Sequence, residues 1–239
     1  MRTIGLIGGM SWVSTAEYYR LINQAVAQQL GALHSARIVL VSVDFAPVAQ
    51  AQHDGRWDAA AAVLVDAAQR LQAAGADCIV LCTNTMHKLA DRIAAAVPLP
   101  FLHIADATGA AARASGLTTV GLLATGFTME QPFLRERLER EHGLRVLVPD
   151  APARADVHRI IYEELCKDVV TDASRARYLQ VIDQLTGAGA QAILLGCTEI
   201  ALLVKPEHTQ LPLLDTTALH AHAAVNFALA QMPARKDAP

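Results

Sequence analysis

Short runs of branched apolar residues recur along the chain, and several of them end in small or polar residues. Two such runs, 76–81 and 190–195, are followed by Cys82-Thr83-Asn84-Thr85 and by Gly196-Cys197-Thr198-Glu199. Nearly continuous apolar runs of this length are typical of parallel strands that are buried on both faces. The pattern predicts an α/β protein with parallel sheets flanked by helices, whose strand ends carry the chemistry.

The same α/β unit occurs twice in the sequence. TIGLIG at 3–8 matches TVGLLA at 119–124, and Ala-rich helical stretches at 58–74 and 173–185 precede the two polar strand ends. The spacing of more than a hundred residues is far longer than a solenoid repeat. We therefore expect two pseudo-symmetric domains, 1–102 plus 215–239 and 103–214, with an active-site cleft between them. Asp215-Thr216-Thr217 is expected to end the strand that returns the chain to the first domain.

Composition narrows the class of protein. The chain has 239 residues, 53% of them apolar, and a formal net charge of −3. No run of about 18 uncharged apolar residues is present, as a membrane-spanning helix would need. The N-terminus leads directly into a predicted strand without the features of a signal peptide, and no basic stripe suggests nucleic acid. We expect a cytoplasmic protein that binds neither nucleic acid nor membranes.

The four cysteines are too few and too irregularly spaced for a disulfide framework or a zinc site. Cys78, Cys82 and Cys166 are expected to pack in the core, as small apolar side chains. Cys197 differs, because Gly196 precedes it and it lies at a strand-to-helix turn, where a helix N-terminus can stabilise a thiolate. Glu199 opposes that effect, so the direction of the pKa shift of Cys197 stays open.

The glycine-rich start of the chain does not match a dinucleotide site. Gly5, Gly8 and Gly9 lack the G-x-G-x-x-G spacing, and no acidic residue follows about 20 positions later at the end of a second strand. The glycines suggest a close approach of the backbone to a small anion. A purely structural tight turn is the alternative.

Other cofactor sites are not suggested by the sequence. A Schiff-base cofactor such as pyridoxal phosphate needs a lysine at a strand end, and no histidine or carboxylate cluster with metal-ligand spacing is present. His87 and His103 lie near strand ends, where a hydrogen-bonded structural role is the more common one. We expect neither an organic cofactor nor a metal. The lysines of the chain instead fall at expected solvated helix or loop positions, namely Lys88, Lys167, Lys205 and Lys236.

Three motifs together resemble the aspartate/glutamate racemases, which are cofactor-independent amino-acid racemases. These motifs are Gly8-Gly9-Met10-Ser11-Trp12, Thr83-Asn84-Thr85-Met86-His87 and Gly196-Cys197-Thr198-Glu199. The resemblance extends over essentially the whole chain and is strongest to the broad-substrate and L-aspartate/glutamate-directed bacterial branch. It implies a two-domain α/β fold and a homodimer.

The resemblance also implies roles for individual residues. In the family, two cysteines flank the substrate's α-carbon, one removing the α-proton and the other delivering a proton to the opposite face. Cys197 corresponds to the second cysteine, which faces the α-hydrogen of the L-enantiomer. The residues implied to bind or line the substrate are Met10, Gln52, Asn84, Thr85, Thr125, Thr128, Thr198 and Glu199.

Thr83 departs from the family, because it stands where the first cysteine is expected. A thiol has a pKa of about 8.5 and an alcohol lies nearer the roughly 15.7 of water, a gap equivalent to about 9 kcal/mol. Thr83 therefore cannot simply replace a thiol. Its role stays open among an acid/base, a proton relay and a group that orients the substrate.

The sequence thus predicts a racemase acting on L-aspartate or L-glutamate, with Cys197 and Thr83 on opposite faces of the substrate. One alternative is a related cysteine-dependent enzyme of the same fold, such as a hydantoin racemase, maleate isomerase or malonate decarboxylase. Another is an amino-acid-binding protein that lost turnover with the first cysteine. Uptake of solvent deuterium at the α-carbon separates an enzyme from a binding protein.

Overall fold

The chain divides into two compact units. The structure, a computed structural model, describes residues 1–167 and 169–230. Unit 1 comprises Met1–Cys82, Leu89–Leu102 and the chain from Ala221 on, and unit 2 comprises Thr83–Lys88 and His103–His220. Each unit contains one parallel four-stranded sheet. The expected fold class, two α/β units with parallel sheets flanked by helices, is confirmed.

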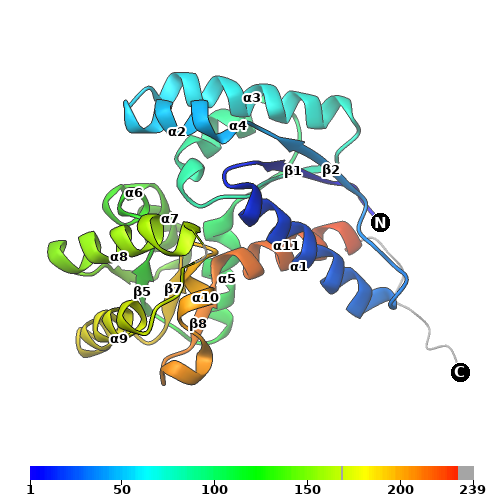
Figure 1. Cartoon of the computed structure of the whole chain (residues 1–239). Coiled ribbons are helices and arrows are strands. Elements are labelled where there is room, and N and C mark those ends of the chain that lie inside the picture. The colour runs from blue at the N-terminus through cyan, green and yellow to red at the C-terminus, as the bar shows by residue number, and fades with distance from the viewer. Residues whose placement is uncertain (168, 231–239) are drawn as a thin grey trace, which may run out of the picture. The chain divides into compact units, whose positions relative to one another are not determined.

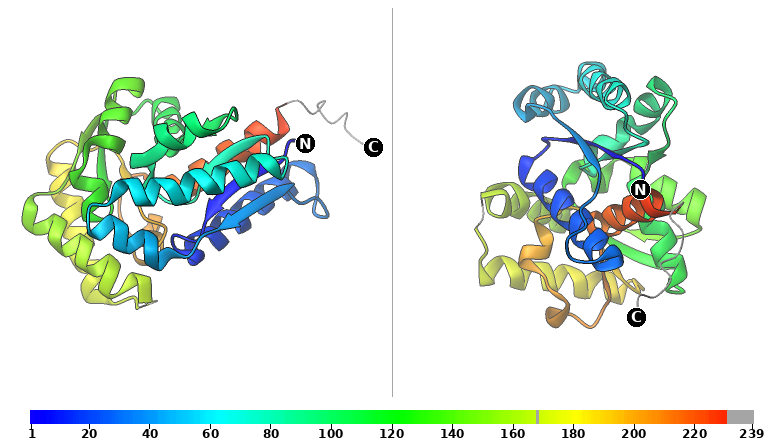
Figure 2. Two further views of the ribbon diagram at one scale, coloured as in Figure 1. Left: turned by 90° about the horizontal axis from the view of Figure 1, so that it is seen from above. Right: turned by 90° about the vertical axis from the view of Figure 1, so that its right-hand side faces the viewer.

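Unit 1 has its strands in the order β2-β1-β3-β4. Helices α2, α3 and α4 cover one face of this sheet, and α1 and α11 cover the other (Figures 1 and 2). The short helix η1 (Thr85–Leu89) follows β3. The elements are β1 (Ile4–Gly8), α1 (Trp12–Leu30), β2 (Ile38–Ser42), α2 (Phe45–His53), α3 (Trp57–Ala73), β3 (Cys78–Leu81), α4 (Ala90–Ala96), β4 (Phe101–Leu102) and α11 (Thr216–Leu229), whose first turns belong to unit 2.

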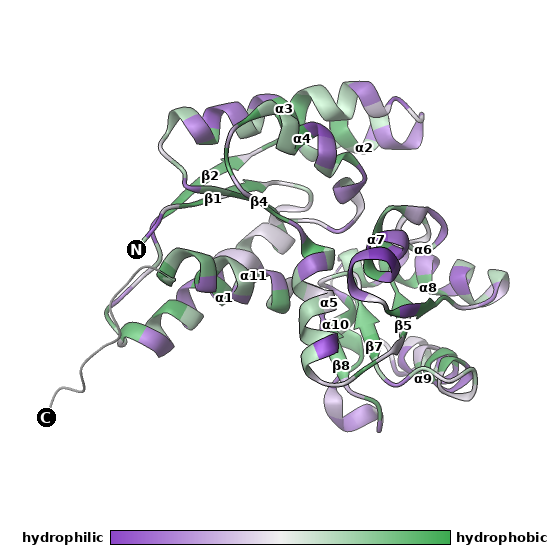
Figure 3. Ribbon diagram, turned by 180° about the vertical axis from the view of Figure 1, so that it is seen from behind, coloured by the Kyte–Doolittle hydropathy of each residue, from purple (hydrophilic) through white to green (hydrophobic). Residues whose placement is uncertain are grey.

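Unit 2 repeats this order as β6-β5-β7-β8. Its strands β5, β7 and β8 are strongly hydrophobic (Figure 3). β8 ends at Asp215, as the sequence pattern predicts. The elements are α5 (Ile104–Ala114), β5 (Thr119–Leu123), α6 (Gly126–Glu130), α7 (Pro132–His142), β6 (Arg145–Leu147), α8 (Ala151–Glu163), η2 (Leu165–Lys167), α9 (Asp172–Gly187), β7 (Ile193–Leu195), α10 (Ile200–Leu203), η3 (Pro206–His208) and β8 (Leu213–Asp215).

The internal duplication extends to the pairing register of the strands. Gly5 of β1 pairs with Ile79, and Gly121 of β5 pairs with Ile193. A Cβ atom on Gly5 would lie 3.3 Å from Leu71 Cδ1 of α3, and one on Gly121 would lie 2.9 Å from Leu185 Cδ1 of α9. The two glycines therefore let equivalent helices approach equivalent strands.

The cores of the two units form around their central strands. All residues of β3 and β7 are buried, and the expected burial of Cys78 and Cys82 is confirmed, since both lie in the apolar cluster of unit 1. Full burial of one aliphatic side chain stabilises a fold by about 1.5–3 kcal/mol. Cys166 is exposed, so the expectation that it packs in the core is wrong. The reason is that α8 ends at Glu163 and the cysteine lies in the short η2 turn beyond it.

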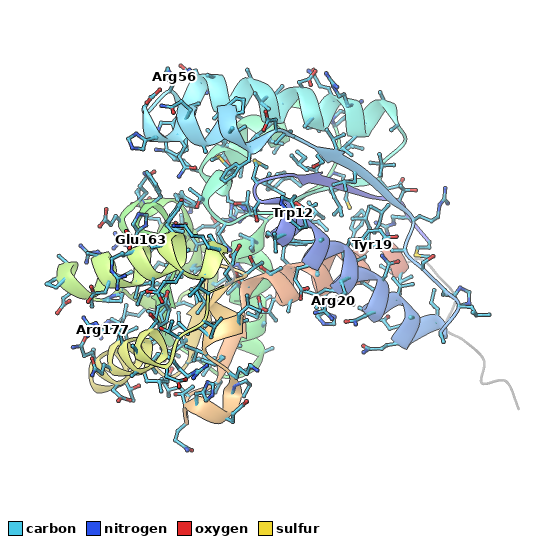
Figure 4. All side chains as sticks on the ribbon, in the orientation of Figure 1. Trp12, Tyr19, Arg20, Arg56, Glu163 and Arg177 are labelled. Atoms are coloured by element: carbon cyan, nitrogen blue, oxygen red, sulfur yellow. The ribbon has the colours of Figure 1, made fainter. Side chains whose placement is uncertain are left out.

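Helix α1 shows how the amphipathic pattern orients a helix. Ser11 caps its N-terminus by accepting a hydrogen bond from the Ser14 amide at 3.3 Å. Tyr18 and Ile22 face the core, whereas Trp12 is 72% exposed at the surface (Figure 4). α1 has 19 residues and a polar face, and no helix in the described ranges is long and apolar enough to span a membrane.

Candidate active site

The end of β7 joins a thiol to a buried carboxylate. Cys197 Sγ donates a hydrogen bond to Glu199 Oε2 at 2.8 Å, and Thr198 Oγ1 donates to the same oxygen at 2.6 Å. Glu199 is buried and Cys197 is partly buried. A Cβ on Gly196 would come within 2.8 Å of Ala124 Cβ, so a glycine is required just before the thiol. The turn places a proton donor and its acceptor side by side.

The thiol of Cys197 is held in its protonated form. Burial raises the pKa of Cys197 well above its ordinary value, and the Glu199 carboxylate raises it further through its charge and its hydrogen bond. This resolves the direction that the sequence left open, because the carboxylate and burial outweigh any benefit of the short helix α10 that follows. The thiol therefore needs a proton acceptor to become a thiolate, and Glu199 is the carboxylate hydrogen-bonded to it.

Three threonine hydroxyls meet at the end of β5. Thr85 Oγ1 lies 3.1 Å from Thr128 Oγ1 and 3.5 Å from Thr125 Oγ1, and the latter two hydroxyl oxygens are 3.3 Å apart. Thr128 is fully buried, and Thr125 directly follows the Ala124 that ends the apolar run of β5. Hydroxyls both donate and accept hydrogen bonds, so this hydroxyl cluster can bind a carboxylate.

Asn84 is fixed beside the end of β7. Its Nδ2 donates to Thr216 Oγ1 at 3.1 Å, and Thr216 Oγ1 in turn donates to the carbonyl of Leu195 at 2.9 Å. Asn84 is 7% exposed and Thr216 is 1% exposed. Thr216 therefore links Asn84, the neighbour of Thr83, to β7, the strand that precedes Cys197.

Residues 83–88 follow β3 of unit 1 but belong to unit 2. Asn84, Thr85 and the imidazole of His87 all form hydrogen bonds with residues of 103–220. In this division Thr83, Asn84 and Thr85 lie in the same compact unit as Cys197, Thr198 and Glu199.

A comparison with protein families decides the class of this protein. A model of the Asp/Glu/hydantoin racemase family matches residues 7–224, which is most of the chain. The chain belongs to this family. The expected enzyme class, an amino-acid racemase, is confirmed by the family and by related structures.

Three solved structures are similar to this racemase. A proposed Asp/Glu racemase from Yersinia pestis is 54% identical, with a TM-score of 0.92, and the match covers 96% of this chain and 100% of that one. An aspartate racemase homologue from Pyrococcus horikoshii OT3 is 28% identical, with a TM-score of 0.85 and coverage of 95% and 99%. The aspartate racemase of Picrophilus torridus is 21% identical, with a TM-score of 0.75 and coverage of 95% and 94%, and shows a shared fold.

The glycine-rich loop of the racemase is explained by packing. The amide of Gly9 donates to Thr15 Oγ1 at 2.8 Å in a buried hydrogen bond, so it is used within the protein. A Cβ on Gly8 would lie 2.3 Å from Thr15 Cγ2, and Gly9 has a φ of +96° with Val43 O 2.1 Å from the position of its Cβ. These contacts favour the structural turn over the anion site.

Two residues implied to line the substrate site lie in unit 1. Met10 follows the glycine-rich turn and is buried, and Gln52 is a buried residue of α2. Their roles toward the substrate stay predictions. In the described part of the racemase, no group of three or more histidine, cysteine, aspartate or glutamate side chains is arranged to hold a metal.

Sequence reasoning missed one residue that connects segments of the site, Thr216. Thr216 was recognised only as part of a strand end, although its hydroxyl connects Asn84 with β7. Its place in a short polar motif directly after β8 is the signal that could have found it. The expected hydrogen-bonded structural role of His87 is confirmed, because its ring contacts the carbonyl of Thr83 and accepts from the amide of Ile104.

Proposed function

We propose that this racemase inverts the α-carbon of aspartate or glutamate without a cofactor and works most readily on the L-enantiomer. The observation that carries the proposal is the hydrogen bond from the Cys197 thiol to Glu199 at the end of β7. Removal of an α-proton needs a base held against the α-carbon. A thiol with its own proton acceptor supplies that base within the protein.

In the first step Glu199 takes the thiol proton, and the Cys197 thiolate removes the α-proton of the L-substrate. The burial and the carboxylate that raise the pKa of Cys197 oppose this step in the empty site. The substrate's ammonium group counteracts them, because a positive charge near a thiolate lowers the thiol's pKa. Binding of the amino acid and activation of the base are thereby coupled.

The polar side chains of unit 2 are suited to an amino acid. We assign Asn84, Thr198 and the hydroxyl cluster of Thr85, Thr125 and Thr128 to the substrate's carboxylate and ammonium groups. Removal of the α-proton leaves negative charge on the α-carbon and its carboxylate. Hydroxyl and amide donors fixed in the folded protein stabilise such charge without reorganising in the reaction.

In the second step the α-carbon receives a proton on the opposite face. We assign this face to Thr83, which donates a proton or relays one from water. A hydroxyl is harder to ionise than a thiol by about 9 kcal/mol, so abstraction of the α-proton from the bound D-enantiomer by Thr83 has the lower turnover number. The two enantiomers have equal free energy, so kcat/KM is the same in both directions. The related proteins described as Asp/Glu or aspartate racemases support a dicarboxylic amino acid as substrate.

The decisive experiment follows L-aspartate and L-glutamate in deuterated water by proton NMR, with chiral chromatography of the same samples. Loss of the α-proton signal together with the appearance of the D-enantiomer supports the proposal. If neither the loss of the α-proton signal nor the D-enantiomer is observed with either substrate, the proposal is contradicted. A parallel panel of a 5-substituted hydantoin, maleate and an arylmalonate reports on the related activities of this fold.

A further inference from the structure

His87 is held by hydrogen bonds at both nitrogens of its ring. The amide of Ile104 donates to Nε2 at 3.2 Å, and Nδ1 lies 2.7 Å from the carbonyl oxygen of Thr83. Because a backbone amide only donates, Nε2 is the acceptor and the ring proton is on Nδ1. His87 therefore donates from Nδ1 to Thr83, and its two backbone partners fix its tautomer.

The surroundings of His87 keep the ring neutral. His87 is 2% exposed, and its ring centroid lies 4.6 Å from that of His103 and 5.6 Å from that of His220. Burial lowers the pKa of His87 well below its ordinary value, and the two neighbouring imidazoles lower it further. The Nδ1–H donor is thus present across the whole neutral pH range, and the ring does not exchange protons with substrate.

The hydrogen bond acts on the backbone of Thr83, the residue that the proposed function assigns to the face opposite Cys197. Thr83 is the second residue after β3, and no strand or helix of its own includes it. The next residues are held through their side chains, Asn84 by Thr216 and Thr85 by the hydroxyl cluster. His87 is the group that fixes the carbonyl of Thr83 itself.

We infer that His87 is a positioning residue for the Thr83 face of the reaction, an inference that rests on the proposed function. By holding the Thr83 carbonyl it sets where the hydroxyl points. A displacement of about 1 Å at a reacting group can cost on the order of 10²-fold in rate. Loss of the Nδ1 donor should therefore slow inversion, while removal of the α-proton by Cys197, at another strand end, continues.

The test uses two variants of His87, in each of which a side-chain amide takes the place of only one of the two ring nitrogens. In His87→Asn the side-chain amide takes the place of Nδ1 and keeps a donor for Thr83, whereas in His87→Gln it reaches the place of Nε2. The readout is the ratio of inversion to α-deuterium exchange with L-aspartate and L-glutamate. We expect His87→Gln to lower this ratio by about tenfold or more and His87→Asn to retain most of it.

The matched control is His103→Asn, which removes the neighbouring imidazole. Asn can still cap α5 by accepting from the Ala105 amide, as His103 does at 3.1 Å. This variant should leave the ratio unchanged. An unchanged ratio in His87→Gln, or an equal fall in His103→Asn, overturns the inference. Absence of exchange in the wild-type protein would instead reject the proposed function.

A measurement on the wild-type protein tests the same inference without relying on a folded variant. Nitrogen-15 NMR of the imidazoles reports which ring nitrogen of His87 carries the proton. The inference requires a neutral ring protonated at Nδ1. A ring protonated at Nε2, or a charged ring near neutral pH, overturns it.

Discussion

The ends of β3 and β7 occupy equivalent places in the duplicated chain but carry different chemistry. Cys197 is followed two positions later by Glu199, which accepts a hydrogen bond from its thiol. Thr83 is followed two positions later by Thr85, whose hydroxyl joins those of Thr125 and Thr128. One strand end thus pairs an acid with a base, and the other presents an alcohol beside neutral hydroxyls.

This difference teaches that the asymmetry of the site involves pairs of residues. A cysteine at position 83 alone would gain a thiol, but it would not gain the neighbouring carboxylate that Cys197 has. Proton removal is therefore expected to be easy on the Cys197 face and slow on the Thr83 face. Substitutions at Cys197, Glu199 and Thr83 test this difference most directly.

The largest effect is expected from Cys197→Ala. This change removes the base for the L-face, and exchange of the α-proton of L-aspartate and L-glutamate should fall by about 10²- to 10⁴-fold, the contribution of a positioned acid/base. Proton NMR in deuterated water measures the rate. Exchange within a few-fold of wild type would exclude Cys197 as this base. The matched control is Cys166→Ala, which removes an exposed thiol and should exchange normally.

Glu199→Gln should separate two effects of the carboxylate, which are to accept the thiol proton and to raise the pKa of Cys197. Loss of the proton acceptor should reduce exchange by on the order of 10²-fold. Because the Glu199 charge and hydrogen bond raise the pKa of Cys197, their removal should move alkylation of this thiol by iodoacetamide to lower pH. Mass spectrometry of the Cys197 peptide follows that reaction. An alkylation profile shifted to higher pH would contradict the arrangement.

Thr83→Cys should make the two strand ends more alike. A thiol is easier to ionise than the hydroxyl, so inversion should accelerate in both directions, with the larger gain in the turnover number of the D-enantiomer. Wild type is expected to exchange the α-hydrogen of the L-substrate faster than it inverts it. We expect the variant to raise the ratio of inversion to exchange by about tenfold, well below the full ionisation difference, because position 85 offers no carboxylate. An unchanged ratio would remove Thr83 from the reaction.

Acid should destabilise the folded protein, because it protonates the buried histidines His87 and His103. Burial lowers the pKa of His87, and that of His103 to about 3, whereas both rings titrate near 6.5 in an unfolded chain. Stability is complete above about pH 6.5 and falls as the pH drops toward 3, by up to about 1.4 kcal/mol per pH unit for each ring. Urea unfolding between pH 8 and 4 tests this. His103→Asn should flatten part of the slope.

The smallest effect is expected from replacing either of the two equivalent glycines, Gly5 and Gly121, by alanine. In Gly5→Ala the new Cβ meets the carbonyl oxygen of Cys78 at 2.7 Å, whereas in Gly121→Ala it meets the side-chain ends of Ile193 and Leu185 at 2.9 Å. Backbone yields less than the tip of a side chain. Both changes should destabilise the protein by about 1–3 kcal/mol, with the larger loss for Gly5→Ala. Denaturant titration of the two variants gives the order directly.

The sequence was sufficient for the parts of the molecule that depend on local pattern. Apolar runs, the repeat and small residues at strand ends predicted both sheets and placed Cys197 beside Glu199. Contacts between distant segments were not predictable in this way, because the bond between Asn84 and Thr216 joins residues 132 positions apart. Cys166 was assigned wrongly because the apolar pattern continues past Glu163, where the helix ends.

The placement of 83–88 has a consequence for recombining this protein with its relatives. The chain passes between the units at 82/83, 88/89, 102/103 and 220/221, so neither unit is a single stretch of sequence. A chimaera joined only at 102/103 and 220/221 would combine Thr85 of one parent with Thr125 and Thr128 of the other. We expect functional hybrids when 83–88 and 103–220 are inherited together, so that the hydroxyl cluster and the histidine contacts come from one parent.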